Sequence, residues 1–313
     1  MPDERPDPQA EPLPAAPTAL RGTPRGHLVV IGGGEDRERD KVILRRFVDL
    51  AGGTRARIVV LTAASQHPDE MWKIYDDAFG ELDVRERVAL TIESREDAND
   101  ERQAAIVRAA TGVFMTGGDQ KRLLALIGGT AIDSAMHEVL ARGGAIAGTS
   151  AGASAMSEHM LAAGGRDVLP EKGAVSLACG LGYIQRVIID QHFSERQRLG
   201  RLLAVVAQNP YLIGIGIDED TALVIEPGRG LEVIGEGAVT LIDGRQMLSN
   251  FLDVDEREKL ELVNVRLHLL PSGARYFFFA NGSDSAIPRP LQEAVAMITS
   301  VSSPLTGAEP LAA

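Results

Sequence analysis

The segment Gly148-Thr-Ser-Ala-Gly152 places a serine between two glycines, directly after a short apolar run. A Gly-x-Ser-x-Gly pattern between a strand and a helix is typical of a tight turn that lifts a nucleophilic serine above the edge of a sheet. Glycines on both sides let other backbone segments approach without a Cβ clash. Ser150 would also lie at a helix N-terminus, which favours developing negative charge. The pattern predicts Ser150 as a nucleophile; a turn that packs a helix or binds phosphate is the alternative.

A serine nucleophile needs a general base, and the sequence contains six histidines. His192 lies just after the predicted strand end Val187-Ile-Ile-Asp190, at the start of a polar loop, and strand ends in open α/β sheets are where ligand sites form. A helix-capping or solvated role fits His192 equally well from its position alone. The remaining histidines have contexts that favour structural or exposed roles, namely His27, His67, His137, His159 and His268.

A triad also needs a carboxylate that accepts the second imidazole N–H and stabilises the imidazolium. Three consecutive acids, Asp218, Glu219 and Asp220, follow the apolar segment 213–217. The residues by themselves do not choose among the three, and a solvated turn or a cation site is the alternative for the whole group.

A glycine pair at another strand end could supply the oxyanion hole. In Gly117-Gly-Asp-Gln120, the N–H of Gly118 would be one donor, and the N–H of Ala151 the second. An ordinary turn between strand and helix explains the pair equally well. The glycines at 32–34 do not continue into the Gly-x-Gly-x-x-Gly spacing, because residue 37 is Arg, so they predict a tight turn beneath the site rather than a dinucleotide site.

Three arginines closely follow His192, in a predicted helix over 195–208. Arg198 and Arg201 share a helix face at i,i+3, whereas Arg196 points elsewhere. Guanidinium groups bind carboxylates through paired hydrogen bonds, so these arginines could recognise an acidic substrate; a solvated helix face is the alternative. The single cysteine, Cys179, lies among small residues without a neighbouring base and is interpreted as a small buried hydrophobe. No residues have convincing metal-site spacing, so we expect neither metal nor cofactor.

The elements that must hold these residues form an alternating pattern. Apolar runs without alternation, such as 27–31, predict strands buried on both faces, as in parallel sheets. Helical patterns separate them, which indicates a doubly wound, mainly parallel α/β sheet flanked by helices over residues 27 to about 160. Shorter strands follow, and we expect them to pair antiparallel and to extend the same sheet. Predicted strands cover 27–31, 56–61, 87–92, 112–115, 144–147, 186–189, 213–217, 221–225, 232–234 and 238–242.

Composition narrows the class of protein. The 313 residues are 44% hydrophobic and 24% charged, which excludes a disordered or fibrous chain. The net charge of −12 argues against a nucleic-acid partner, and no apolar run approaches a membrane span. We therefore expect a soluble, cytoplasmic protein. The expected organisation is a disordered leader over 1–26, a single α/β domain over 27–281, and a tail over 282–313 with a short docked helix at 291–298.

Taken together, the motifs resemble the cyanophycinases, serine peptidases related to the aspartyl dipeptidases, with a fold like that of the class I glutamine amidotransferases. Any one motif is modest evidence, whereas their order and spacing across residues 27 to 280 are specific. The matching blocks are Val30-Ile-Gly-Gly-Gly34, Thr116-Gly-Gly-Asp-Gln120, Gly148-Thr-Ser-Ala-Gly-Ala153, Asp190-Gln-His-Phe193 with Arg196, Arg198 and Arg201, and Gly216-Ile-Asp-Glu-Asp-Thr221.

The resemblance implies a triad of Ser150, His192 and Glu219 in that chain order, and so selects one acid from the triplet. It implies hydrolysis of cyanophycin, a poly-aspartate backbone with arginine on each β-carboxyl group, to β-Asp-Arg dipeptides by an exopeptidase. It also suggests a homodimer. The substrate pocket that it implies is formed by Gln120, Asp190, Gln191, Arg196, Arg198 and Arg201.

Three other interpretations stay open at this point. An α-aspartyl dipeptidase-like enzyme would use the same triad on smaller substrates. An α/β-hydrolase esterase shares Gly-x-Ser-x-Gly but places its acid before its histidine, which would require His268 as the base. A non-catalytic protein would use the turn at Ser150 to bind an anion.

Overall fold

The computed structural model describes residues 26–165, 169–278 and 287–300. The predicted leader lies outside the described residues except for Gly26, as does most of the predicted tail. Within the tail, helix α9 covers Arg289–Ile298 and buries Leu291, Ala294, Val295 and Ile298.

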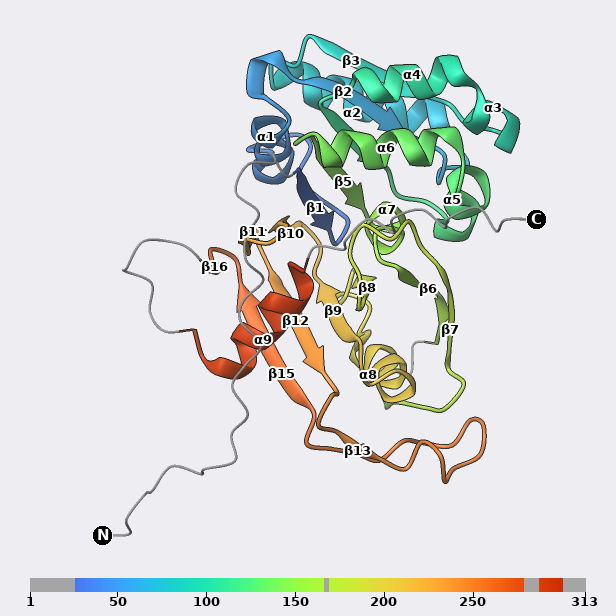
Figure 1. Cartoon of the computed structure of the whole chain (residues 1–313), viewed down its shortest axis with the longest axis vertical. Coiled ribbons are helices and arrows are strands. Elements are labelled where there is room, and N and C mark those ends of the chain that lie inside the picture. Colours follow the sequence, from blue (N-terminus) through green and yellow to red (C-terminus); the bar gives the residue numbers. More distant parts are fainter. Residues whose placement is uncertain (1–25, 166–168, 279–286, 301–313) are drawn as a thin grey trace, which may run out of the picture.

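The main sheet has eight strands, five from the first half of the chain and three from the second, in the order β16-β11-β10-β1-β5-β4-β2-β3 (Figure 1). Its strands β1, β5, β4, β2 and β3 are parallel, which confirms the predicted doubly wound α/β class. The remaining three extend the sheet by antiparallel pairing. The strands are β1 His27–Ile31, β2 Arg57–Leu61, β3 Glu86–Leu90, β4 Gly112–Met115, β5 Ala145–Thr149, β10 Thr221–Glu226, β11 Gly230–Gly235 and β16 Arg275–Phe277.

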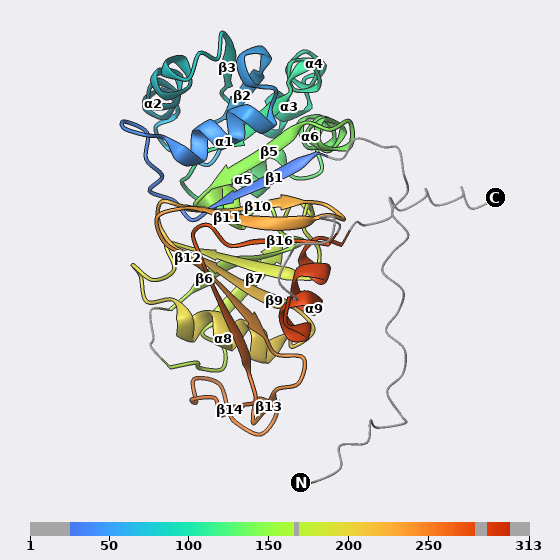
Figure 2. The ribbon, with the colours of Figure 1, turned by 90° about the vertical axis from the view of Figure 1, so that its left-hand side faces the viewer.

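Helices cover both faces of the parallel strands, with α1 and α2 on one side and α3, α4 and α6 on the other (Figure 2). The strand residues alternate accordingly: Val29 and Ile31 pack in the core beneath α1 and α2, whereas Leu28 and Val30 pack in the core on the opposite face. Burial on both faces explains the continuous apolar runs. The helices are α1 Val42–Leu50, α2 Pro68–Glu81, α3 Arg95–Asn99, α4 Glu101–Ala109, α5 Gln120–Ile127 and α6 Ala131–Ala141.

A separate four-stranded sheet, in the order β15-β12-β9-β8, lies beside the main sheet. The prediction that the later strands extend one sheet is right for β10 and β11 and wrong for β8, β9 and β12. The expected antiparallel pairing is found for β9 with β12, but β8 pairs parallel with β9. Ile215 and Ile217 pack in the same core as Leu28, whereas Ile188 and Ile242 pack against α8. This sheet is therefore buried on both faces as well. Its elements are β8 Val187–Gln191, β9 Ile213–Ile217, β12 Ala238–Asp243, β15 Arg266–Pro271 and α8 Leu199–Gln208.

Helix α8 begins four residues later than predicted. Residues 195–198 form turns, because Gln197 has a left-handed φ of 52° and the N–H of Arg198 bonds to the carbonyl of Phe193. The helix expected to begin after Ser150 is the short α7 Ala151–Ser154. The sequence patterns missed several short elements: η1 Gly53–Arg55, β6 His159–Gly164, β7 Val175–Cys179, β13 Leu248–Ser249 and β14 Leu262–Val263. Cys179, expected to be buried, is exposed at the end of β7, a strand that pairs with β6 alone and has no fully buried residue.

Among the described residues, no single helix is long and apolar enough to cross a membrane. Helices α5 and α6 meet the length and composition of a span only as a pair bent by 96°.

Candidate active site

Ser150 occupies a strained turn between β5 and α7. Its φ of 52° and ψ of −109° lie outside the regions that L-residues favour, and its N–H is held by the carbonyl of Ile31 at 3.0 Å. The two flanking glycines are required by close backbone contacts. A Cβ on Gly148 would lie 2.4 Å from the carbonyl oxygen of Gly152, and a Cβ on Gly152 would lie 2.5 Å from that of Met115. The segment therefore forms the turn that its pattern predicts.

The side chains of Ser150, His192 and Glu219 form a continuous hydrogen-bonded chain. Nε2 of His192 lies 2.9 Å from Oγ of Ser150, and its Nδ1 lies 2.5 Å from Oε1 of Glu219. With the proton on Nδ1, the ring donates to Glu219 and can accept the serine proton at Nε2. The His192 side chain is 12% exposed and that of Glu219 is 41% exposed, so the acid lies at the solvent side.

Only Glu219 of the acidic triplet reaches the imidazole. The carboxylate of Asp218 instead accepts hydrogen bonds from the N–H and hydroxyl of Ser194, at 3.1 and 2.5 Å. Asp220 accepts one from the N–H of Asp36 at 2.8 Å. Asp218 and Asp220 thus hold loops around the site. The sequence pattern alone does not show which of the three acids contacts the histidine.

The glycines after β1 make room for the imidazole and its carboxylate. A Cβ on Gly33 would lie 2.4 Å from Cε1 of His192, and one on Gly34 would lie 3.1 Å from Oε2 of Glu219. Gly32 accepts a 2.8 Å hydrogen bond from the N–H of His192. The glycine run therefore forms a turn beneath the site, as interpreted from the sequence.

A second glycine turn, after β4, lies beside the serine. A Cβ on Gly117 would be 3.4 Å from Cβ of Ser150, and Gly118 has a φ of 142° with no room for a Cβ against the carbonyl of Ala64. Within the described part of the chain, the N–H groups of Gly118 and Ala151 make no hydrogen bond. Two free amides on either side of a serine are the donors that an oxyanion hole requires.

A buried ion cluster adjoins the serine. Asp190, 1% exposed, accepts two hydrogen bonds from Arg201, one of them at 2.6 Å, and one from Arg198 at 3.1 Å. Arg198 also donates to Gln191, whose Oε1 lies 3.5 Å from Oγ of Ser150. Burial lowers the pKa of Arg198 to about 10, so it stays charged at neutral pH. Two cations on one carboxylate leave the cluster with one net positive charge.

These features can be compared with known proteins. A model of peptidase family S51 matches residues 28–233. The chain belongs to peptidase family S51.

Relatives match this S51 peptidase over most of their own length. A cyanophycinase from Synechococcus elongatus is 41% identical over 254 residues, covering 80% of this chain and 79% of that protein. A cyanophycinase from Geminocystis herdmanii is 40% identical, covering 80% and 93%. The crystal structure of a peptidase from an acI-B1 Actinobacterium is 23% identical with a TM-score of 0.61, covering 81% and 97%, and shares the fold. The chain is thus a serine-type peptidase with a class I glutamine amidotransferase-like fold.

Two other residues expected in the substrate pocket of this S51 peptidase, Gln120 and Arg196, do not bond to Asp190 as Arg198 and Arg201 do. The amide of Gln120 donates to the carbonyl of Leu161 at 3.1 Å, which ties α5 to β6. Arg196 is exposed and is joined to His192 through its backbone N–H. Its charge contributes, after burial and Arg201, to the lowered pKa of Arg198. His268, the base that an esterase would need, lies in β15, at the opposite edge of the second sheet from β8 and His192.

Sequence reasoning missed one buried acid behind the serine. Glu35, 3% exposed, accepts a hydrogen bond from the hydroxyl of Thr149 at 2.6 Å and one from the phenol of Tyr75 at 2.5 Å. Burial, and then the charge of Glu35, raises the pKa of Tyr75 well above its usual value, so the phenol stays a donor. The signal for it in the sequence is an acid directly after the glycine run Gly32-Gly-Gly34.

Proposed function

We propose that this S51 peptidase hydrolyses cyanophycin, multi-L-arginyl-poly-L-aspartate, to β-Asp-Arg dipeptides through an acyl-enzyme on Ser150. The observation that carries the proposal is the hydrogen-bonded chain from Ser150 through His192 to Glu219, beside a cluster with net positive charge. Relatives named cyanophycinase, about 40% identical over 80% of the chain, support the choice of substrate.

The proposed reaction begins when Nε2 of His192 takes the proton of Ser150 as its Oγ attacks the carbonyl of an aspartyl amide. Negative charge then develops on the carbonyl oxygen, where the N–H groups of Gly118 and Ala151 donate to it. Glu219 stabilises the imidazolium. The C–N bond breaks as His192 passes its proton to the leaving amine, and a water molecule, deprotonated by His192, hydrolyses the ester and frees the serine.

Substrate recognition in this account depends on positive charge. Each arginyl group of cyanophycin carries a free α-carboxylate, and the net cation of Arg198 and Arg201 on Asp190 would attract it. Asp190 itself is fully engaged by the two arginines, so its role is to orient them. A homodimer and a cytoplasmic location stay predictions.

The test is incubation of the purified protein with insoluble cyanophycin and, separately, with simple α-aspartyl dipeptides, followed by mass spectrometry of the supernatant. Release of β-Asp-Arg from the polymer is the expected result. Cleavage of the dipeptides alone would keep the triad and identify an aspartyl dipeptidase-like enzyme instead. Cleavage of neither substrate would contradict the proposal.

A further inference from the structure

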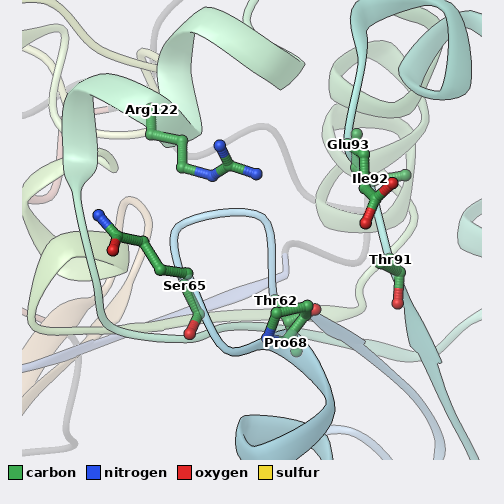
Figure 3. Close-up of a pocket in the computed structure, with 8 residues that line it drawn as sticks. Thr62, Ser65, Pro68, Thr91, Ile92, Glu93 and Arg122 are labelled. Carbon is green, nitrogen blue, oxygen red and sulfur yellow. The ribbon is translucent and has the colours of Figure 1, made fainter.

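A pocket lies at the edge of the main sheet that also carries Ser150, beyond the glycine turn at Gly117 and Gly118. It forms where β2 and β3 end, under the first turn of α5 (Figure 3), and has an empty volume of about 320 Å³, including the part open to solvent. Its polar lining comes from Thr62, Ser65, Gln66, Thr91, Glu93 and Arg122.

The pocket contains a buried hydroxyl without a partner. Thr62 is 1% exposed, and its Oγ1 makes no hydrogen bond within the described part of the chain. Buried polar atoms are almost always hydrogen-bonded, because an unpaired one costs about 1–3 kcal/mol. This oxygen is itself covered, so it lies beneath the pocket surface, and the charged side chains above it are the groups that a ligand would contact.

Opposite charges face this pocket from its two sides. Arg122 is fixed through its Nε, which donates to the carbonyl of Ala63 at 3.1 Å, and Figure 3 shows its guanidinium extending over the loop after β2 toward the side formed by Glu93. Across the ranges that the structure describes, neither the Nη groups of Arg122 nor the carboxylate of Glu93 has an ionic partner. A ligand with both a carboxylate and a cation would match this arrangement.

The strand order places the pocket along a path from the serine. Ser150 follows β5, and β4, β2 and β3 come next in the sheet. With strands about 4.8 Å apart, a pocket between β2 and β3 lies roughly 12 Å along the edge from the end of β5. An extended chain covers about 3.3–3.6 Å per residue, so the separation corresponds to three or four residues. The loop that carries Ala64, against which Gly118 packs, separates the two sites.

From these contacts, and resting on the proposed function, we infer that the pocket is a subsite for one arginyl group of the polymer, three or four aspartyl units from the bond that is cleaved. Such a group carries an α-carboxylate and a guanidinium. Arg122 binds the carboxylate, and Glu93 binds the guanidinium.

The experiment compares a substrate that is too short to reach the pocket, (β-Asp-Arg)₂, with one that is long enough, (β-Asp-Arg)₆. The main variant is Glu93→Gln, because Glu93 is exposed and lies outside the catalytic machinery. Its matched control is Glu86→Gln, which changes an exposed acid at the other end of β3. Arg122→Gln, with Arg102→Gln on α4 as control, tests the opposite charge.

We expect Glu93→Gln to lower kcat/KM on the long substrate about tenfold, mainly through KM, and to leave the short substrate unchanged. Arg122→Gln should act in the same direction, and both controls should match the wild type. An unchanged kcat/KM on the long substrate, or an equal loss on both lengths, would overturn the subsite. If the wild type cleaves neither length, the proposed function itself fails, which is a distinguishable result.

Discussion

The hydroxyl of Thr149 donates a 2.6 Å hydrogen bond to Glu35, so that a buried carboxylate holds the residue directly before Ser150. The other oxygen of Glu35 accepts from Tyr75, a fully buried side chain of α2. Ser150 has a strained backbone, and strained residues persist only where their surroundings fix them. Glu35 therefore holds the turn that carries Ser150, and we expect it to act as a positioning residue.

Replacing this acid should slow catalysis without preventing folding. We expect Glu35→Gln to lower kcat about tenfold with little change in KM, because a weaker bond to Thr149 loosens Ser150 but leaves the substrate cluster intact. Tyr75→Phe, which removes the bond on the far side, should have a smaller effect. Steady-state kinetics and the rate at which a fluorophosphonate probe labels Ser150 measure both. Equal labelling rates in Glu35→Gln and wild type would contradict the positioning role.

The acidic triplet offers a test with two internal controls. Glu219→Gln should lower kcat by roughly 10²–10⁴-fold, because the imidazolium loses its carboxylate and the favoured tautomer. Asp218→Asn and Asp220→Asn should retain most of the activity, since these side chains bond to Ser194 and Asp36. The measurement is kcat for each of the three purified variants. If either control lost more activity than Glu219→Gln, Glu219 would not be the acid of the triad.

The cluster around Asp190 makes a prediction about stability. Asp190→Asn leaves Arg201 and Arg198 without their buried carboxylate, and breaking such a pair costs about 3–5 kcal/mol. We expect a clear fall in the denaturant midpoint at unchanged m-value, measured by urea unfolding. If Asp190 acted only as a substrate ligand, KM would rise while the midpoint stayed at the wild-type value.

The tight packing behind Ser150 can be tested at Gly148. Gly148→Ala should destabilise the protein by ~3 kcal/mol or more, because the new Cβ meets the carbonyl of Gly152 at 2.4 Å. Gly129→Ala is the matched control: nothing lies within 4 Å of its Cβ, so only the cost of its φ of 70°, about 1 kcal/mol, remains. Thermal unfolding compares them, and similar melting temperatures would contradict the steric account.

The sequence predicted the parallel strands and the turn at Ser150 because both depend on local pattern. Apolar runs such as Val29–Ile31 can be recognised without knowing their distant partners. The pair Gly148 and Gly152 marks a turn whose backbone contacts leave no room for a Cβ, which few turns have. The separate second sheet could not be predicted in this way, because β9 has the same apolar character as β10 and only its tertiary contacts assign it to another sheet.

Side-chain partners were the harder part of the site. The sequence identified Asp190, Arg198 and Arg201, but not that the arginines bind the aspartate rather than facing solvent independently. Their convergence depends on the turn at Gln197, where the predicted helix does not form. Glu35 was overlooked because its partners, Thr149 and Tyr75, are 114 and 40 residues away along the chain.

The central claim is that Ser150 is the nucleophile that cleaves cyanophycin, and one comparison tests it most directly. Wild type and Ser150→Ala, matched by circular dichroism and melting temperature, are incubated with cyanophycin, and released β-Asp-Arg is quantified by mass spectrometry. The account predicts release by the wild type and a loss of at least about 10⁴-fold in the folded variant. A folded Ser150→Ala protein that releases β-Asp-Arg at a rate close to that of the wild type would contradict it.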